Sequence, residues 1–312
     1  MPRVVTFGEA MLRLSPPGRR RIEQAASLDV WPAGSELNVA IGLARLGWSA
    51  SWVSRLPRNP LGRLIEAHAR ANRVETASVT WADDTRLGLY FVEVAEPPRP
   101  TTALYDRAGS AFATLDPAEL DWPELLEGVD AFHVSGITPA LSKACATATE
   151  EALAAARAAG CHTSYDVNFR TRLTTPEDAA RQVERLAPHL DAVLCSNRDA
   201  HALFGLDEPD ELRDRLASPL VVLSSREQRV AVGDTTEVIR RRTYEAVDPI
   251  GAGDAFCAGF LDSLLNGVGL RIALERGETM SALKLTIPGD APLISPGEVE
   301  TLLTDRPVGV DR

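Results

Sequence analysis

The second half of the chain alternates short, continuously apolar segments with helical ones, and this alternation constrains the fold more than any other feature. The expected strands are 131–135, 162–167, 192–195 and 220–223. The helical patterns between them are 142–159, a segment after Pro176 and further helices to about Leu216. Strands that are apolar on both faces are typical of a parallel sheet that helices cover on both sides. The sequence therefore predicts an α/β fold with a mainly parallel central sheet and helices on both faces.

The first half adds strands and helices of the same kind together with segments of a different kind. Residues 4–7 and 49–54 are expected strands. One helix is expected from about 35 to 46, and the stretch 56–62 leads into a second helix that runs through about 71. The different segments alternate polar and apolar residues, and they are 11–15, 22–31, 86–94 and 101–107. Prolines between the last two of these segments indicate a hairpin with a stiff loop. Together these segments predict a small sheet separate from the main one.

Composition excludes several classes of protein. The 312 residues suffice for one large domain or one domain with a small appendage. A net charge of −11 argues against nucleic acid or an anionic membrane surface as the main partner. The chain has no long apolar span and no start like a signal peptide, so a cytoplasmic protein is expected. The four cysteines are far apart and include no Cys-x-x-Cys pair, so reduced core thiols are expected, with neither a zinc site nor a disulfide framework.

Near the C-terminal end, Gly251, Ala252, Gly253 and Asp254 lead directly into an apolar helix. Glycines let the backbone approach a ligand closely, and the first amides of a helix together with its dipole favour an anion. A carboxylate beside such a turn suits a general base next to a phosphoryl group. No lysine lies between Gly251 and Gly259, which excludes a Walker A loop, and a dinucleotide-binding turn would need a glycine in place of Phe256. The structural alternative is a tight turn in which Asp254 only caps the helix.

The pattern Asp-x-x-Gly-Ala-Gly-Asp at 248–254, followed by a helix of small apolar residues, resembles the signature of the ribokinase (PfkB carbohydrate kinase) family. The resemblance implies that residues 1–312 form a single ribokinase-like α/β domain with a β lid built from about 11–31 and 86–107. It also implies that Asp254 deprotonates a sugar hydroxyl while the backbone of Gly251, Ala252 and Gly253 forms an anion hole. ATP and Mg²⁺ are the expected cofactors.

Several stretches resemble the 2-keto-3-deoxygluconate kinases of this family, whose substrate carries a carboxylate. These stretches are 105–111, 135–139, 166–170 and 286–290, and Gly34 with Asn38 resembles a Gly-Gly-x-x-x-Asn sugar motif in which Ala33 replaces the first glycine. The residues expected to bind the sugar are Gly34, Asn38, Tyr90, Tyr105, Arg107, Ile137, Asn168 and Arg170. A single arginine is usually a surface group, but two at the mouth of one site suit a carboxylate. Arg107 and Arg170 are therefore expected to bind the acid group of the substrate.

The nucleotide side departs from the family pattern. After the strand at 220–223 the family usually has Lys-x-Gly-x-x-Gly, whereas this chain reads Ser-Ser-Arg-Glu-Gln-Arg at 224–229. Ser196-x-x-Asp199 stands in place of the family's Asn-x-x-Glu, which is linked to magnesium and phosphate. The residues expected to bind the nucleotide are Ser196, Asp199, Ser224, Arg226, Arg229 and Gly253, and no metal ligand is assigned. Arg226 and Arg229 either reach a phosphate oxygen in place of the missing glycines or point into solvent.

The resemblance implies ATP-dependent phosphorylation of a sugar-acid hydroxyl, with 2-keto-3-deoxygluconate and its 6-phosphate as the expected substrate and product. A kinase of a neutral sugar, of the fructokinase or ribokinase type, is the alternative. The altered stretch at 224–229 motivates a further alternative, a catalytically weak protein that binds sugar as a sensor. The expected partners are a small sugar acid and ATP, and the lid is the surface through which copies of the chain would associate if it forms homo-oligomers.

Overall fold

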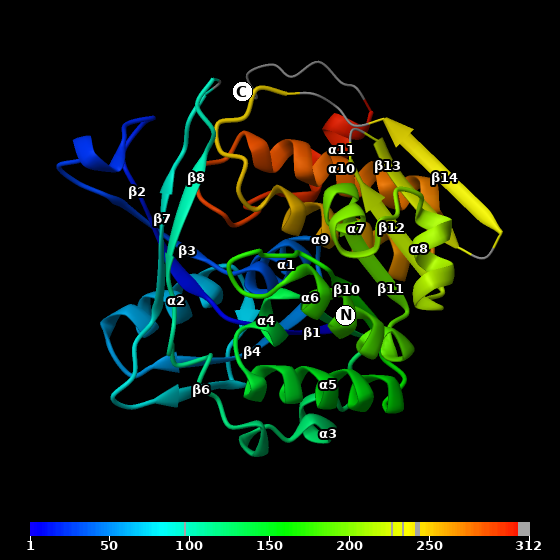
Figure 1. Cartoon of the computed structure of the whole chain (residues 1–312), viewed down its shortest axis with the longest axis horizontal. Coiled ribbons are helices and arrows are strands. Elements are labelled where there is room, and N and C mark those ends of the chain that lie inside the picture. The colour runs from blue at the N-terminus through cyan, green and yellow to red at the C-terminus, as the bar shows by residue number, and fades with distance from the viewer. Residues whose placement is uncertain (97, 226, 233, 241–243, 305–312) are drawn as a thin grey trace.

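The computed structural model describes residues 1–96, 98–225, 227–232, 234–240 and 244–304. Within this part of the chain, ten strands form one large sheet in the order β14-β13-β12-β11-β10-β9-β1-β4-β5, with β6 paired to β4 (Figure 1). The neighbouring strands β12, β11, β10, β9, β1, β4 and β5 are parallel, as is β6 to β4, so the expected mainly parallel sheet is confirmed. Their bounds are β1 Arg3–Phe7, β4 Ser49–Pro57, β5 Val74–Glu75, β6 Val79–Ala82, β9 Ala131–Ser135, β10 His162–Asp166, β11 Ala192–Ser196 and β12 Leu220–Ser224.

The hairpin β13 (Glu227–Val232) and β14 (Thr235–Arg240) extends the large sheet beyond the expected strands. Both strands pair antiparallel, β13 with β12 and β14 with β13. The sheet thus continues shortly after Ser224, with β13 in the stretch where the family usually has its glycine-rich sequence. An antiparallel strand needs only a short connection, which is why the chain can turn back here without a helix.

Helices cover both faces of the large sheet because alternate residues of each strand point to opposite sides. In β11, Ala192 and Leu194 pack with one apolar cluster, and Val193 and Cys195 pack with the other. The first cluster includes residues of α1 Ser35–Arg45, α2 Pro60–Ala71, α9 Ala252–Leu265, α10 Leu270–Leu285 and α11 Pro296–Leu303. The second includes residues of α3 Trp122–Leu125, α5 Lys143–Ala158, α6 Pro176–Leu186, α7 Asn197–Phe204 and α8 Pro209–Leu216. The short α4 (Ile137–Ala140) follows β9 directly.

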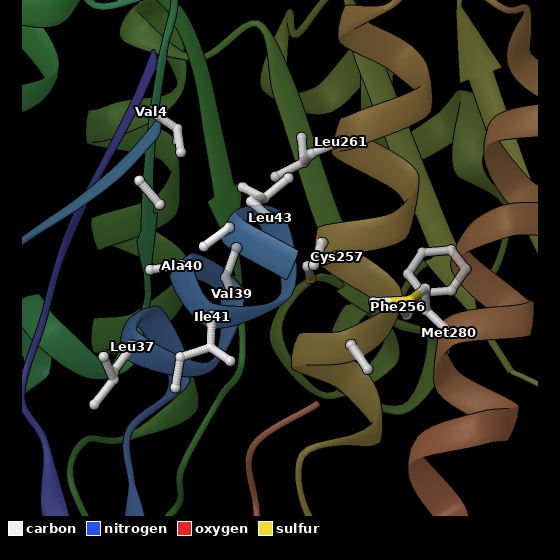
Figure 2. Packing of buried hydrophobic residues seen from close by; sticks show 14 of the residues in the cluster. Val4, Leu37, Val39, Ala40, Ile41, Leu43, Phe256, Cys257, Leu261 and Met280 are labelled. Carbon is white, nitrogen blue, oxygen red and sulfur yellow. The ribbon is translucent and has the colours of Figure 1, made fainter. Parts of the chain in front are cut away.

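Helices α1 and α9 pack closely, and this brings their N-termini together. Figure 2 shows Leu43 of α1 directed toward α9, where Leu261 lies, and Phe256 of α9 beside Met280 of α10. The close approach depends on Gly42, because a Cβ at this position would lie 2.5 Å from the Cβ of Ala258. The consequence for function is that side chains from the first turns of both helices can meet.

The expected small sheet is present and separate from the large one (Figure 1). Its strands, in spatial order, are β3 Asp29–Ala33, β2 Met11–Ser15, β7 Gly88–Glu93 and β8 Thr102–Asp106. The expected segment at 22–31 is only partly extended, since Ile22–Gln24 form a short 3-10 helix and the strand continues to Ala33. The helix expected from about residue 35 begins at Ser35, directly after this strand and Gly34. Met11, Ala33, Tyr90 and Val92 form the apolar centre of this sheet.

No helix in the described residues has the length and apolar character needed to cross a membrane.

Candidate active site

A cavity of about 380 Å³ lies between the small sheet and the ends of several strands and helices that belong to the large sheet and its covering layers. Its walls include the residues expected to bind the sugar, which are Gly34, Asn38, Tyr90, Tyr105, Arg107, Ile137, Asn168 and Arg170. Gly251, Gly253 and Asp254 also contribute, whereas Ala252 is buried and does not line the cavity. Segments that are distant in the sequence thus converge on one hollow, at the edge of the parallel sheet where ligands usually bind.

The Asp254 carboxylate is held by donors from the first turns of α1. Ser35 Oγ donates to one carboxylate oxygen at 2.8 Å, and Asn38 Nδ2 donates to the other at 2.7 Å. Asn168 Nδ2 in turn donates to Ser35 Oγ at 3.1 Å. Burial raises the pKa of Asp254 to about 6, although the hydrogen bonds from Asn38 and Ser35 act in the opposite direction. Asp254 is therefore a positioned carboxylate with a pKa suited to accepting a proton near neutral pH.

The turn before α9 has a conformation that requires glycine. Gly251 has φ +84°, and a Cβ at this position would lie 2.0 Å from the Asp290 carbonyl oxygen. At Gly253 no atom lies within 4 Å of such a Cβ, so the turn faces open space there. The first amides of a helix have no intrahelical acceptor and point outward along the positive end of the dipole. The turn can therefore receive an anion beside Asp254.

The two expected carboxylate-binding arginines have different surroundings. The Arg107 side chain is only 9% exposed, and its guanidinium pairs with Glu9, with Nε 2.9 Å from Oε2. Arg170 is exposed and forms no ion pair with any residue that the structure describes. The positive charge of Arg170 nevertheless lowers the pKa of both Asp254 and Asp166, which places it near the base. Arg170 thus has an available guanidinium at the cavity, whereas that of Arg107 is engaged with Glu9.

A second cavity, of about 170 Å³, adjoins the first and shares Asp166, Asn168 and Gly253 with it. Four of the residues expected to bind the nucleotide line it, namely Ser196, Asp199, Ser224 and Gly253. Ser196 lies opposite Ser224 in the register of neighbouring parallel strands, so both residues end at the same edge of the sheet. The second cavity lies beyond the anion-binding turn, and this position suits a nucleotide whose terminal phosphate reaches Gly251–Gly253.

The expected role of the arginines at 226 and 229 changes with the structure. Arg229 does not line the second cavity, and its guanidinium binds Glu208 at 2.7 Å and the Asn197 side-chain oxygen at 2.6 Å. Its side chain is 16% exposed, so it neither reaches into the cavity nor points into solvent. The reason is that β13 carries Arg229 alongside the segment between α7 and α8. Arg226 lies outside the described residues.

Carboxylates near the shared wall of the two cavities suit a magnesium ion that arrives with the nucleotide. Burial raises the pKa of Asp166 to about 8, and the neighbouring charges of Asp254 and Asp199 add to this rise. The described residues contain no cluster of three or more His, Cys, Asp or Glu that could hold a metal alone. Mg²⁺ in phosphotransfer sites is usually bound by one or two carboxylates together with the phosphates and water. Asp199 and Asp166 provide this kind of donor set.

Some residues of the site were not expected from the sequence. Ser35 was expected only to open a helix, yet its hydroxyl bonds to Asp254. Asp290 lines the sugar cavity and is bound by Arg13 at 2.8 Å and by the hydroxyl of Tyr90. Burial raises the pKa of Asp290. The only sequence signal for Asp290 is its place in the stretch 286–290, and these partners are far from it along the chain.

Comparisons with known proteins agree with this geometry. Residues 1–295 match the sequence profile described as pfkB family carbohydrate kinase. A 2-dehydro-3-deoxygalactonokinase of Haloferax volcanii is 42% identical, and the alignment covers 99% of both chains. A 2-dehydro-3-deoxygluconokinase of Bacillus subtilis is 30% identical over 92% of this chain and 90% of its own length. The crystal structure of a 2-dehydro-3-deoxygluconokinase from Thermotoga maritima superposes with a TM-score of 0.92, at 34% identity, over 97% of this chain and 100% of that one. The chain belongs to the pfkB family of carbohydrate kinases.

Proposed function

We propose that this carbohydrate kinase transfers the γ-phosphoryl group of ATP to a hydroxyl of a 2-dehydro-3-deoxy sugar acid. The observation that carries the proposal is that Asp254 and the available guanidinium of Arg170 line one cavity. A guanidinium without an ion-pair partner is a natural ligand for a carboxylate, whereas a neutral sugar carries no charge that could pair with it. Relatives named for such sugar acids support the same substrate class.

Two substrates that differ in configuration at C4 are the specific candidates. The expected one is 2-keto-3-deoxygluconate, phosphorylated at its 6-hydroxyl. Its galacto epimer is the second, because the relative with 42% identity is named a 2-dehydro-3-deoxygalactonokinase. The epimers carry the same carboxylate, so Arg170 would bind both, and the choice between them depends on the cavity wall near C4.

In the proposed reaction, Asp254 accepts the proton of the sugar hydroxyl as the oxygen of that hydroxyl bonds to the γ-phosphorus. The bond from phosphorus to the bridging oxygen of ADP breaks, and ADP leaves with that electron pair. Ser35 and Asn38 orient the carboxylate, and the amides of 251–253 stabilise the charge of the transferred group. Bound Mg²⁺, for which Asp199 and Asp166 are the proposed ligands, would neutralise phosphate charge.

We further propose that the small sheet is the lid of a single working domain. Tyr90 and Tyr105 stack with ring centroids 5.5 Å apart and contribute to the wall of the cavity from this sheet. Apolar rings above a sugar exclude water, which limits loss of the phosphoryl group to hydrolysis.

The decisive experiment measures ADP release from ATP and Mg²⁺ with a panel of acceptors. The panel contains 2-keto-3-deoxygluconate, its galacto epimer, fructose and ribose, with a reaction without sugar as the control. Release that depends on one of the acids supports the proposal. Release with fructose or ribose alone would support the neutral-sugar kinase, and binding of sugar without release of ADP would support the sensor.

The pH dependence of the reaction tests Asp254 as the base. Because the unprotonated carboxylate is the active form and its pKa is raised to about 6, kcat/KM should rise with pH through about 6 and level off above it. The measurement is kcat/KM for the sugar acid between about pH 5 and pH 8. A flat profile across this range would contradict the assignment.

Substitution of Arg170 tests recognition of the carboxylate. In Arg170→Ala, KM for the sugar acid should rise by about ten- to a hundredfold, because one charge-assisted pair is worth roughly 1.5–3 kcal/mol. KM for a neutral sugar of the same size should change little. Arg172→Ala is the matched control, because Arg172 is exposed nearby but does not line the sugar cavity. Equal losses with both kinds of sugar would mean that Arg170 shapes the site without binding the acid group.

Arg107→Ala should behave differently from Arg170→Ala. The substitution leaves the buried Glu9 without its guanidinium partner. An unpaired buried charge destabilises the fold, so the effect should appear on acid and neutral substrates alike. A selective loss with the acid would instead restore Arg107 as a carboxylate ligand.

A further inference from the structure

One buried cation lies below the site and has no part in the reaction described above. The chain contains two lysines, Lys143 and Lys284, among its 33 basic residues. Lys143 is exposed on α5, whereas Lys284, near the end of α10, has a relative exposure of 0%. Burying an ammonium is costly unless other groups replace its water, so its partners show what it does.

The Lys284 ammonium is bound by backbone carbonyls from two segments. Nζ lies 2.9 Å from the Ile287 carbonyl oxygen and 3.5 Å from that of Asp248. Asp248 opens the segment that ends in the anion-binding turn, and Ile287 lies in the loop that leads to Asp290. The ammonium therefore links these two segments through their backbone carbonyls.

The same two segments determine where the anion-binding turn lies. The Asp248 carboxylate accepts hydrogen bonds from the amides of Ile250 at 3.2 Å and Gly289 at 3.0 Å. Gly251 packs directly on the carbonyl of Asp290, as the 2.0 Å approach of an added Cβ indicates. A shift of either segment would therefore move the amides of 251–253 relative to Asp254.

The nearby carboxylates have another partner, which leaves the carbonyls to Lys284. Arg13 Nη1 lies 2.8 Å from a carboxylate oxygen of Asp248 and 2.8 Å from one of Asp290. Arg13 and Lys284 together balance these two acids, and removal of the ammonium leaves one negative charge in excess. Burial lowers the pKa of Lys284, while the charges of Asp248 and Asp290 oppose that change. A compact point charge fits between two carbonyls, where the planar fork of an arginine would not.

We propose that Lys284 is a built-in cation that positions the anion-binding turn, a role that rests on the proposed kinase function. An ammonium bound by carbonyl oxygens resembles a monovalent ion such as potassium or ammonium in charge and in its preference for oxygen ligands. The wild-type enzyme therefore needs no added monovalent cation for turnover. Such an ion can take the place of the side chain when that side chain is shortened.

The test compares Lys284→Met and Lys284→Ala with wild type and with Lys143→Met as the matched control. Assays use tetramethylammonium as the sole monovalent cation, and potassium or ammonium is then added at equal ionic strength. Wild type and Lys143→Met should show full turnover without either ion. In Lys284→Met, kcat should fall by about ten- to a hundredfold with little change in KM for the sugar acid, because the turn is misplaced rather than the sugar site. In Lys284→Ala, potassium or ammonium should restore part of the lost kcat.

Methionine keeps most of the volume of lysine, so Lys284→Met should fold, and a thermal melt checks this. Wild-type turnover that requires potassium, or a kcat of Lys284→Met equal to that of wild type, would overturn the inference. A loss in Lys284→Ala that neither ion relieves would also overturn it.

Hydrogen exchange separates this inference from the proposed function. The amides of 248–254 should exchange faster in Lys284→Met than in wild type or Lys143→Met, and potassium should slow their exchange in Lys284→Ala. If wild type phosphorylates no sugar acid, the proposed function fails, and these exchange rates still decide whether Lys284 holds the turn. Unchanged exchange in Lys284→Met would overturn the inference whatever the substrate is.

Discussion

Replacement of Asp254 by asparagine is expected to reduce kcat by about 10²–10⁴-fold, the usual cost of removing a general base. Asparagine has nearly the same shape as aspartate and can still meet Ser35, but its amide cannot accept the proton of the sugar hydroxyl. Affinity for the sugar acid should change much less, because Arg170 and the lid residues remain in place. The effect should therefore fall on kcat rather than on binding.

The measurement combines steady-state kinetics with calorimetric titration of the sugar acid into the variant. Asp178→Asn is a suitable control. Asp178 is exposed on α6, and its replacement removes the same negative charge at a position away from the cavity. The inflection of kcat/KM near pH 6 should disappear in Asp254→Asn. Turnover near that of wild type on the true substrate would remove Asp254 from the role of base.

Replacement of Gly251 by alanine is expected to reduce kcat by about 10²–10³-fold, as for loss of a donor from an oxyanion hole. The new Cβ would lie 2.0 Å from the backbone carbonyl of Asp290, so the turn has to move. The amides of 251–253 would then no longer face the phosphoryl group beside Asp254. Binding of the sugar should be affected less, because most residues that line the cavity lie outside the turn.

The control for this variant separates displacement of the turn from backbone strain. Gly267 also has a positive φ, +68°, but an added Cβ there meets no atom within 4 Å. Alanine at either position bears the strain of the left-handed region, about 1–2 kcal/mol. Gly251→Ala adds the cost of moving the turn away from the Asp290 carbonyl, so it should lose more stability than Gly267→Ala in a thermal melt. Only Gly251→Ala should lose turnover. Equal turnover of the two variants would mean that the turn does not stabilise the transferred group.

Local patterns of sequence predicted most of the fold. Strands β11 and β12 are apolar except for their last residue because both of their faces are covered, and this pattern can be read without knowledge of their neighbours. The bounds of the small sheet and the hairpin β13–β14 were less legible. Their strands are partly exposed, and pairing between strands depends on which residues meet across the sheet.

The candidate site could also be predicted only in part from the sequence. The residues expected at the sugar cavity do line it, and they were expected because short stretches of the sequence resemble those of related sugar-acid kinases. The state of each side chain could not be predicted, because its partner is distant in the chain. Arg107 and Glu9 are 98 residues apart, and Ser35 and Asp254 are 219 apart.

The sequence by itself determined the chemistry that the site can offer, since a glycine turn, a carboxylate after it and an apolar helix are local features. The tertiary structure decided which of these groups are available. It engages Arg107 with Glu9 and Arg229 with Glu208, leaves Arg170 available, and raises the pKa of Asp254 to about 6 by burial. The physical reason is that burial and electrostatic pairing depend on distances through space, which only the folded chain defines.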